Sequence, residues 1–453
     1  MKYIPIIGLE VHVELATESK MFCNCPAEHF GVEPNTHTCP VCLGLPGALP
    51  VPNKKALEWT IMLSQALGCK INLESHFDRK NYFYPDLPKG YQITQYERPF
   101  GENGGVSLKN QESGIKKIRI RRVHLEEDTG KLQHAEINGE SVSLVDFNRS
   151  GVPLVEIVTE PDFRSIEEVD EYLKKLQKII RYLGISNADM EKGSMRIEPS
   201  VSIAPISNFK FKTPNLPNYR VELKNINSFR FARKAIDYEI KRQTELLEKG
   251  DKIIQQTRGW DDIRNVTVPQ REKEKAHDYR YFPEPDIPPI ELTGEQVSGI
   301  KYQGELPDEK FARFQKDYGL SDYDAGILTE NRETADYYEA AVKAANVLVG
   351  ADREIPLKLW RKMIANQIIN KKVNTAETVP AELVKKIVES KKTSEVDEEK
   401  LDAAVNEVLN NNSEVVASFK NGKTGVIGFL IGSVKRIVPA DPRLIEEKLR
   451  KKL

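Results

Sequence analysis

The sequence lacks a long hydrophobic run. Its longest stretch of mostly apolar residues and glycine, Gly425 to Val434, is far shorter than the roughly 20 residues of a membrane-spanning helix. The first residues carry no long apolar segment of the signal-peptide kind, and strand-like alternation begins almost at once. We therefore expect a soluble, cytoplasmic protein with no membrane partner.

The sequence also lacks an excess of either charge, with 67 Lys and Arg against 68 Asp and Glu. Any contact with nucleic acid must therefore depend on a local basic region. Neither the Gly-rich loop of P-loop enzymes nor the dinucleotide-binding fingerprint is present, and there is no internal repeat. If the protein handles ATP, we expect divalent ions held by carboxylates, with Lys or Arg on the phosphates.

Cysteine is scarce, with five residues in 453, but four of them form two close pairs. Cys23 and Cys25 are followed, after thirteen residues, by Cys39 and Cys42. This spacing is typical of a zinc ribbon, in which four thiolates form a closed structural site. Disulfides are the alternative, although a reducing cytosol favours zinc. His29 or His37 could replace one thiolate, but we expect both to be surface residues.

The chain is long enough for two to four domains at roughly 150 residues each. Residues 1 to about 160 have mostly strand and loop patterns, while capping residues and apolar spacing predict helices at 53–67, 166–183 and 229–250. A proline-rich stretch at 283–289 predicts a boundary. The pattern is helical beyond Pro307, and residues 389–400 resemble a charged linker or a solvated helix surface. We therefore predict domains at 1–290, with the zinc ribbon at 23–42, and at 291–400 and 401–453.

The last 34 residues contain nine Lys or Arg and three Asp or Glu. They include an apolar helix expected from Thr424 to Ile437, which carries three glycines. The positive excess predicts contacts with RNA phosphates. For the glycines alone, tight helix packing is the alternative interpretation.

Residues 7–15 alternate strictly between apolar and polar side chains. One face holds leucine and valine, and the other holds Glu10, His12 and Glu14. Two carboxylates around an imidazole suit a divalent cation, although a solvated strand face is the alternative.

Further carboxylates lie in strand-like contexts and would be costly to bury alone. Glu156 stands within an apolar run and must be paired, protonated or bound to metal. Other members of this acidic set are Glu198, Glu222 and, beside His124, Glu126, Glu127 and Asp128.

Two segments, 77–86 and 277–286, interleave aromatic residues with Arg and Lys beside proline. Such segments suit the stacking of an unpaired nucleotide end near phosphate contacts. An aromatic cluster that covers a sheet edge is the alternative.

Six segments together resemble a known family. They are residues 7–15 (IGLEVHVEL), 77–86 (FDRKNYFYPD), 124–131 (HLEEDTGK), 145–149 with 151–157 (VDFNR, GVPLVEI), 222–229 (ELKNINSF) and 278–286 (DYRYFPEPD). In this order they closely resemble the B subunit of the glutamine-dependent aspartyl/glutamyl-tRNA amidotransferases, the GatB family. The resemblance covers nearly the whole chain.

The resemblance implies an α+β cradle domain with an antiparallel or mixed sheet, followed by an all-α domain and a small all-α tail that binds tRNA. It implies a ligase that forms a carbon–nitrogen bond with glutamine as the amido donor. ATP would phosphorylate the side-chain carboxylate of Glu-tRNA(Gln) or Asp-tRNA(Asn), and ammonia would then displace phosphate. The implied partners are the amidase GatA, the small protein GatC, which completes a heterotrimer, and misacylated tRNA; an aminoacyl-tRNA synthetase could join them. A non-catalytic tRNA-binding scaffold is the alternative.

The resemblance also implies roles for individual residues. Glu10, His12 and Glu127 match the magnesium region, which Glu156, Glu198 and Glu222 would complete. Lys80 and Arg149 would contact phosphate or the substrate carboxylate, with Glu127 also catalytic, while Tyr82 and Arg280 would bind the aminoacylated tRNA end. Strand alternation, in contrast, places Glu126 on the face with His124, unless a turn follows Leu125.

The chain departs from the family pattern in three places. The four-cysteine cluster is absent from some members, which favours a structural role for zinc. Residues 197–200 read Ile-Glu-Pro-Ser where many bacterial members have Cys-Asp-Ala-Asn, which is reminiscent of archaeal relatives. Residues 385–410 are shorter than the usual helical domain, so the connection to the tail is in question.

Overall fold

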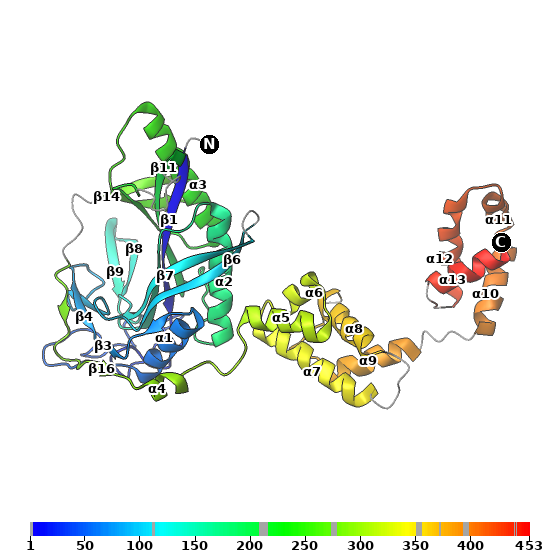
Figure 1. Ribbon diagram of the computed structural model, residues 1–453, viewed down its shortest axis with the longest axis horizontal. Helices are drawn as coiled ribbons and strands as arrows, with labels where there is room; N and C mark the ends of the chain where they lie inside the picture. The colour runs from blue at the N-terminus through cyan, green and yellow to red at the C-terminus, as the bar shows by residue number, and fades with distance from the viewer. Residues whose placement is uncertain are drawn as a thin grey trace. The chain divides into compact units, whose positions relative to one another are not determined.

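The computed structural model describes residues 3–110, 114–207, 216–272, 279–349, 356–370, 373–392, 398–438, 440 and 442–453. The chain divides into two compact units, Met1–Glu309 and Lys310–Leu453. The first unit combines strands and helices, and the described part of the second is helical (Figure 1). This arrangement confirms the expected α+β class with helical C-terminal parts. The prolines at 283–289 lie within the first unit.

A nine-stranded sheet forms the main layer of the first unit. Its strand order is β14-β13-β12-β11-β1-β10-β7-β6-β2. Strands β12 and β13 are parallel, and the other pairs of described strands are antiparallel. The strand bounds are β1 (Tyr3–Glu14), β2 (Lys70–Ile71), β6 (Gly101–Asn110), β7 (Gly114–Glu127), β10 (Pro153–Thr159), β11 (Met195–Pro205), β12 (Val221–Lys224), β13 (Gln256–Asp261) and β14 (Val266–Glu272).

Three helices supply the apolar layer that packs on one face of this sheet (Figure 1). They are α1 (Lys54–Ala66), α2 (Ile166–Leu183) and α3 (Phe229–Lys249), close to the predicted bounds. Side chains of Asn53, Ser165 and Ser228 cap their N-termini by accepting backbone N–H groups. Gly184 ends α2 with φ of 69°, a conformation that favours glycine. The three helix predictions are confirmed.

The two faces of β1 differ as its alternation predicts. Leu9, Val11 and Val13 are 1%, 0% and 0% exposed and belong to the core beneath the helices. Glu10 and His12 lie on the opposite face, because neighbouring side chains of a strand point to opposite sides. Packing therefore fixes which face is apolar and leaves the polar face for a site.

The described part of the first unit also contains smaller sheets and the short helix α4. Strand β5 lies against the end of β7, where the Ile93 N–H donates to Glu127 and the Leu125 N–H donates to Gln95. These contacts place the first small sheet beside the polar side chains of β7. The element bounds are β15 (Phe282–Pro283), β4 (Asp78–Asn81) and β5 (Tyr91–Thr94) in one sheet, β16 (Ile290–Glu291) and β3 (Glu74–Ser75) in a second, β8 (Lys131–Ile137) and β9 (Glu140–Asp146) in a third, and helix α4 (Gly294–Gly299).

The C-terminal helices bury two apolar clusters. The first includes Phe314, Tyr338 and Ile364, and the second includes Leu401, Leu430 and Ile445. Within the described residues, no helix combines the length and apolar character needed to cross a membrane. The helices are α5 (Pro307–Tyr318), α6 (Asp322–Leu328), α7 (Arg332–Val349), α8 (Leu357–Asn370), α9 (Pro380–Lys392), α10 (Glu398–Asn411), α11 (Ser413–Lys420), the 3-10 helix η2 (Thr424–Val426), α12 (Ile427–Ile437) and α13 (Pro442–Lys452).

Two expectations for this region need adjustment. The apolar helix expected from Thr424 begins at Ile427, after the 3-10 turn. Residues 389–392 and 398–400, expected in a charged linker, belong to α9 and α10, whereas 393–397 lie outside the described residues.

Candidate active site

Three neighbouring strands bring one imidazole–carboxylate cluster together. His12 on β1 lies opposite Glu156 on β10, and Glu156 lies opposite His124 on β7. The Glu156 Oε2 atom is 3.5 Å from His12 Nε2 and 3.0 Å from His124 Nε2. Glu126, two residues after His124 on the same face, is 3.8 Å from His12 Nε2. We call His12, Glu126 and Glu156 the first cluster; their potential ligand atoms lie within 4.8 Å of one another.

The environment holds the first cluster in charged forms. Burial lowers the pKa of His12, but the carboxylates of Glu156, Glu126 and Glu198 together outweigh it, and the pKa rises to about 9. Burial raises the pKa of Glu156, but His124 and His12 outweigh that effect and hold it well below its ordinary value. Without a metal ion, protonated imidazoles thus balance the buried carboxylates.

A second cluster lies next to the first on the same face. Its members are Glu10 on β1, Glu198 on β11 and Glu222 on β12, and their ligand atoms also lie within 4.8 Å of one another. Glu198 is the direct cross-strand partner of Glu10. Burial raises the pKa of Glu10, and Glu156 and Glu198 raise it further. Lys224 partly balances this charge, with its Nζ 2.9 Å from Glu198 and 3.3 Å from Glu222.

Both clusters line one cavity of about 400 Å³. Lys80 on β4 also lines it, and its Nζ lies 5.1 Å from the centre of the Tyr279 ring. Burial lowers the pKa of Lys80, but the surrounding acidic groups, chiefly Glu126 with Tyr281 and Glu156, together outweigh it, so the pKa rises and the ammonium persists. The structure thus brings Lys80 to the metal-ligand candidates as predicted.

Tyrosines form one wall of the site. Tyr281 stacks on Tyr96 with ring centroids 4.1 Å apart, and Tyr279 contacts both Tyr281 and Tyr82 edge to face. Of the predicted substrate residues, Tyr82 supports this wall through its contact with Tyr279, although the cavity lining contains Tyr96, Tyr279 and Tyr281 and not Tyr82 itself. Arg280 is exposed, and its φ of 44° places the flanking tyrosines on either side of a sharp bend. Residues His277 and Asp278 of the same segment lie outside the described residues.

Glu127 does not join either cluster, which corrects the assignment based on the resemblance. Strand β7 continues to Glu127, so no turn follows Leu125 and alternation sends Glu127 to the other face. Its carboxylate lies 2.5 Å from Lys89 Nζ and accepts the Ile93 N–H at 3.0 Å. Glu126 occupies the position expected for Glu127.

Arg149 also lies apart from the clusters. Its guanidinium donates to the carbonyls of Thr129 and Gly130 and lies 3.7 Å from Asp128. Asp128 accepts a second cation, the Arg196 guanidinium, at 2.7 Å. Burial raises the pKa of Asp128, but the two arginines outweigh it and hold the pKa below its ordinary value. Arg149 therefore orders the chain after β7 rather than lining the cavity.

The four paired cysteines converge, with their Sγ atoms within 4.8 Å of one another. The Cys23 thiol lowers the pKa of Cys42 to about 4, with help from the Cys39 N–H and Lys20. Lys20 is 1% exposed and reaches Cys42 Sγ at 3.7 Å and the Phe147 carbonyl at 3.3 Å. A buried cation beside four sulfur atoms suits a metal site of net negative charge.

The two histidines of the cysteine segment have other partners. His29 Nε2 lies 3.1 Å from Glu14, and His37 Nδ1 lies 2.8 Å from the Glu28 carbonyl. The His29 side chain is 9% exposed, so the expectation of a surface position was wrong for it.

Several residues of the cavity were not singled out as site residues from the sequence. Lys224 is two positions after Glu222 and Arg122 is two before His124, so alternation alone could have placed both on this face. The same alternation places His124 and Glu126 on this face. Arg196, two residues before Glu198, shares this face by the same rule, but its guanidinium binds Asp128 and does not line the cavity.

A cavity lined by converging acidic, basic and aromatic side chains is typical of an enzyme active site. Residues 5–298 match the family model of the GatB/GatE catalytic domain, and residues 358–453 match that of the GatB domain. The chain therefore belongs to the family of GatB, the B subunit of the tRNA-dependent amidotransferases.

Individual relatives agree with the family models. The B subunit of the aspartyl/glutamyl-tRNA(Asn/Gln) amidotransferase from Thermodesulfovibrio yellowstonii is 46% identical over 483 residues, which cover 100% of this chain and 99% of the relative. Proteins of the same name from Caldicellulosiruptor saccharolyticus and Thermotoga maritima are 44% and 43% identical with the same coverage.

Proposed function

We propose that this chain activates and amidates the side-chain carboxylate of misacylated tRNA. ATP phosphorylates the carboxylate of Glu-tRNA(Gln), Asp-tRNA(Asn) or both, and ammonia from a partner protein then displaces phosphate. One observation carries the proposal: two adjacent carboxylate clusters and Lys80 share one cavity. Such a site suits a reaction in which one anion attacks another. The names of the relatives support the same reaction.

Magnesium is the ion proposed for the two clusters. Glutamate oxygens and an imidazole nitrogen are donors that suit a hard or borderline divalent cation. The first cluster would hold it through His12, Glu126 and Glu156, and the second through Glu10, Glu198 and Glu222. When bound, magnesium would neutralise phosphate charge and align the reacting oxygens.

The chain's own cations and aromatic rings complete the proposed mechanism. The substrate carboxylate attacks the γ-phosphorus, the bond to ADP breaks, and ammonia later attacks the acyl carbon as phosphate leaves. Lys80 offsets the negative charge of the phosphoryl group. Lys224 neutralises part of the charge of the second cluster and so reduces its repulsion of the phosphoryl group. Tyr82, Tyr279 and Tyr281 offer ring faces to the terminal nucleotide of the tRNA.

Three predicted residues take different places in this proposal. From their positions, Glu127 and Arg149 would act as positioning residues, because their side chains bind Lys89 and the backbone after β7. Arg280, which is exposed at the end of the tyrosine wall, remains proposed for contacts with tRNA phosphates.

The remaining parts of the proposal concern zinc, partners and the tail. Cys23, Cys25, Cys39 and Cys42 fit one structural zinc ion, since four thiolates leave no open position. The protein would work in the cytoplasm with an amidase and a small third protein, in the roles of GatA and GatC, and with an aminoacyl-tRNA synthetase where one joins them. The helical segment 401–453 would bind tRNA, after a helical domain at 291–400.

The non-catalytic scaffold is not favoured, because a scaffold needs no cavity lined by six converging ligand candidates. The deciding experiment reconstitutes the chain with its partner proteins and offers ATP, magnesium and each misacylated tRNA. We expect ADP and amidated aminoacyl-tRNA to form with at least one tRNA. Binding of tRNA without ADP formation would support the scaffold instead.

A further inference from the structure

The last residues of β7 are held along one edge by side chains in place of a strand. The pairing of β6 with β7 ends at Val123, whereas β10 pairs with the other edge as far as Glu127. On the edge beyond β6, the Leu125 N–H donates to the side chain of Gln95 at 3.0 Å. The side chain of Gln92 donates to the Glu127 carbonyl at 2.7 Å. Because a buried backbone group without a partner is costly, these two glutamines fix β5 against β7.

The side chain of Gln95 is also locked from its other end. Its amide N–H donates to Ser75 Oγ at 2.6 Å, and this hydroxyl donates to the Arg98 carbonyl at 2.5 Å. All three side-chain partners of this chain of bonds lie in the small-sheet region, and both Gln95 and Ser75 are buried. The amide oxygen of Gln95 therefore points to β7 in one defined orientation, and the small sheet meets the nine-stranded sheet in one register.

Thr94, the last residue of β5, makes the contact that reaches the first cluster. Its hydroxyl donates to Glu126 Oε2 at 3.1 Å, and both side chains are buried. The other carboxylate oxygen, Glu126 Oε1, is the one that lies 3.8 Å from His12 Nε2. The terminal torsion of a glutamate is soft, so a hydrogen bond to one oxygen decides where the other oxygen points. Thr94 therefore presents Glu126 Oε1 to the other ligand candidates of the first cluster.

The same strand also sets the direction of Lys80. In the antiparallel pair of β4 with β5, Lys80 lies opposite Gln92, two residues before Thr94. Opposite residues, and residues two apart, share one face of a sheet. Since Gln92 and Thr94 bond to β7, this face is turned to the cavity, which Lys80 and Glu126 both line. The hydrogen bonds between β5 and β7 thus place one cation and one carboxylate of the site together.

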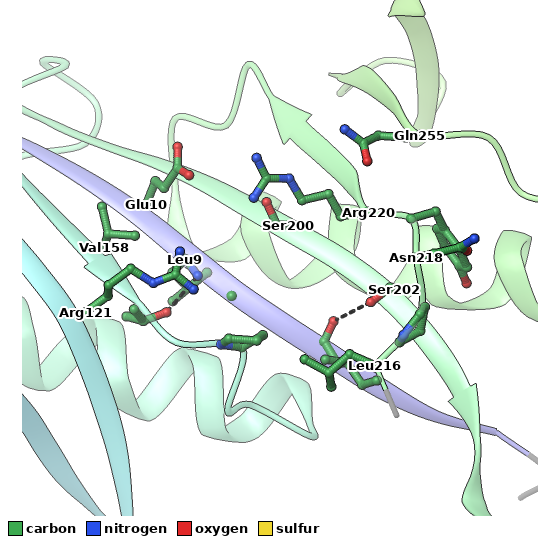
Figure 2. Close-up of a pocket in the computed structure, with 16 residues that line it drawn as sticks. Leu9, Glu10, Arg121, Val158, Ser200, Ser202, Leu216, Asn218, Arg220 and Gln255 are labelled. Atoms are coloured by element: carbon green, nitrogen blue, oxygen red, sulfur yellow. Dashed lines mark hydrogen bonds between the residues drawn. The ribbon is translucent and has the colours of Figure 1, made fainter. Parts of the chain in front are cut away.

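Glu10 of the second cluster provides a contrast. Figure 2 shows hydrogen bonds among the residues around Glu10, and none of those drawn reaches its carboxylate. Glu126, in contrast, is held by a neutral hydroxyl before any ion arrives. A neutral donor fixes a carboxylate oxygen without cancelling its charge, which is the arrangement that a metal ligand needs.

We propose that Thr94 is a positioning residue for the activation reaction, and that it acts by aiming Glu126 Oε1 at the ion of the first cluster. This inference rests on the proposed function, in which magnesium aligns the reacting oxygens. Loss of a group that hydrogen-bonds to a metal ligand typically lowers metal affinity or activity by about 10- to 100-fold. Removal of the Thr94 hydroxyl should therefore weaken the use of magnesium although every proposed ligand is still present.

The test changes Thr94 in the full complex with its partner proteins. Thr94→Val keeps the shape of the side chain and removes the hydroxyl, whereas Thr94→Ser keeps the hydroxyl. Thr60→Val is the matched control, because the buried Thr60 hydroxyl donates to the Ala56 carbonyl within α1 at 2.8 Å. We expect Thr94→Val to raise the magnesium concentration for half-maximal ADP formation by about tenfold or more. Thr94→Ser should restore most of the wild-type dependence, and Thr60→Val should match the wild type.

Two further measurements test the route through Glu126. Magnesium should raise the melting temperature less in Thr94→Val than in the wild type or in Thr60→Val, a readout that needs no turnover. If Thr94→Val does not fold in EDTA, Thr94→Ala removes the same hydroxyl and takes its place. In a chain that already carries Glu126→Gln, Thr94→Val should change the rate of ADP formation by less than about twofold, because the two residues act as one unit.

The outcomes separate this inference from the proposed function. If the wild-type complex forms no ADP with either misacylated tRNA, the proposed function fails, and the magnesium-induced rise in melting temperature still decides the role of Thr94. If the wild type is active and Thr94→Val has the wild-type magnesium dependence, only the positioning role is wrong. Equal losses in Thr94→Val and Thr94→Ser, or a full additional loss on top of Glu126→Gln, would also overturn it, because the hydroxyl would then not act through Glu126.

Discussion

Glu126 and Glu127 are consecutive residues of β7 whose carboxylates serve opposite faces of the sheet. Glu126 lies 3.8 Å from His12 Nε2, within the first cluster. Glu127 lies 2.5 Å from Lys89 Nζ and accepts a backbone N–H from β5. Two neighbours of identical chemistry therefore have different tasks, and they form a matched pair for mutagenesis.

We expect Glu126→Gln to slow ATP-dependent activation and Glu127→Gln to weaken the fold. Removing one electrostatic element of a reaction site costs on the order of 10²–10³ in rate. Glu127→Gln leaves the buried Lys89 ammonium without its partner, at a cost of about 3–5 kcal/mol in stability. ADP formation and melting temperature should be measured for both variants. If Glu127→Gln stops activation at unchanged melting temperature while Glu126→Gln does not, the two roles are reversed.

The metal-free protein should lose stability as pH rises. The pKa of His12 is raised to about 9 from 6.5, so the folded state binds more protons than the unfolded state between these values. The contribution of His12 to the free energy of unfolding is fully present below pH 6.5 and is lost as the pH approaches 9. The change amounts to at most about 3 kcal/mol. Melting of the first unit in EDTA should be followed from pH 6.5 to 9. His12→Gln should flatten this dependence, whereas exposed His134→Gln should not; equal slopes in all three proteins would contradict the assignment.

Zinc should be present and should stabilise the first unit without taking part in turnover. Elemental analysis of pure protein should find one zinc ion, and Cys39→Ser with Cys42→Ser should remove it. The double variant should lose melting temperature far more than its rate at permissive temperature, because four thiolates leave no open position for chemistry. Stoichiometric disulfides in freshly reduced protein, or no zinc, would refute this prediction.

Removal of the C-terminal helices α10 to α13 should weaken tRNA binding and spare activation. A chain that ends at Lys392 loses α10 to α13 together, including the nine basic residues of 420–453. Phosphate contacts confer salt-dependent affinity, so the KM for tRNA should rise and its salt dependence should decrease. Lys435→Gln with Arg436→Gln should reproduce a smaller effect with the helices intact. Unchanged affinity and salt dependence in the truncated complex would show that this segment has another role.

The local alternation of apolar and polar residues predicted much of the first unit. The alternation of β1 correctly separated Leu9, Val11 and Val13 from Glu10 and His12, because a strand has a two-residue period whatever its partners. The same rule placed Glu126 beside His124, whereas residue-by-residue resemblance favoured Glu127. The structure supports the simpler rule, since β7 continues without a turn.

Convergence could not be predicted in the same way. Glu156, Glu198 and Glu222 meet Glu10 and His12 because β10, β11 and β12 take particular registers around β1. Register depends on packing between distant segments and leaves no local trace in the sequence. The pairing of Asp128 with Arg196 has the same origin.

The most direct test measures ADP formation with misacylated tRNA in complexes that carry Glu10→Gln or His12→Ala. Each change removes a ligand or a charge from one cluster, while His134→Ala on the exposed hairpin serves as the control. We predict ADP formation at least about 10² slower in both cluster variants at full glutaminase activity of the partner. Magnesium should also raise the melting temperature less in the variants than in the wild type. ADP formation at the wild-type rate in either variant would show that the carboxylates are structural and that activation occurs elsewhere.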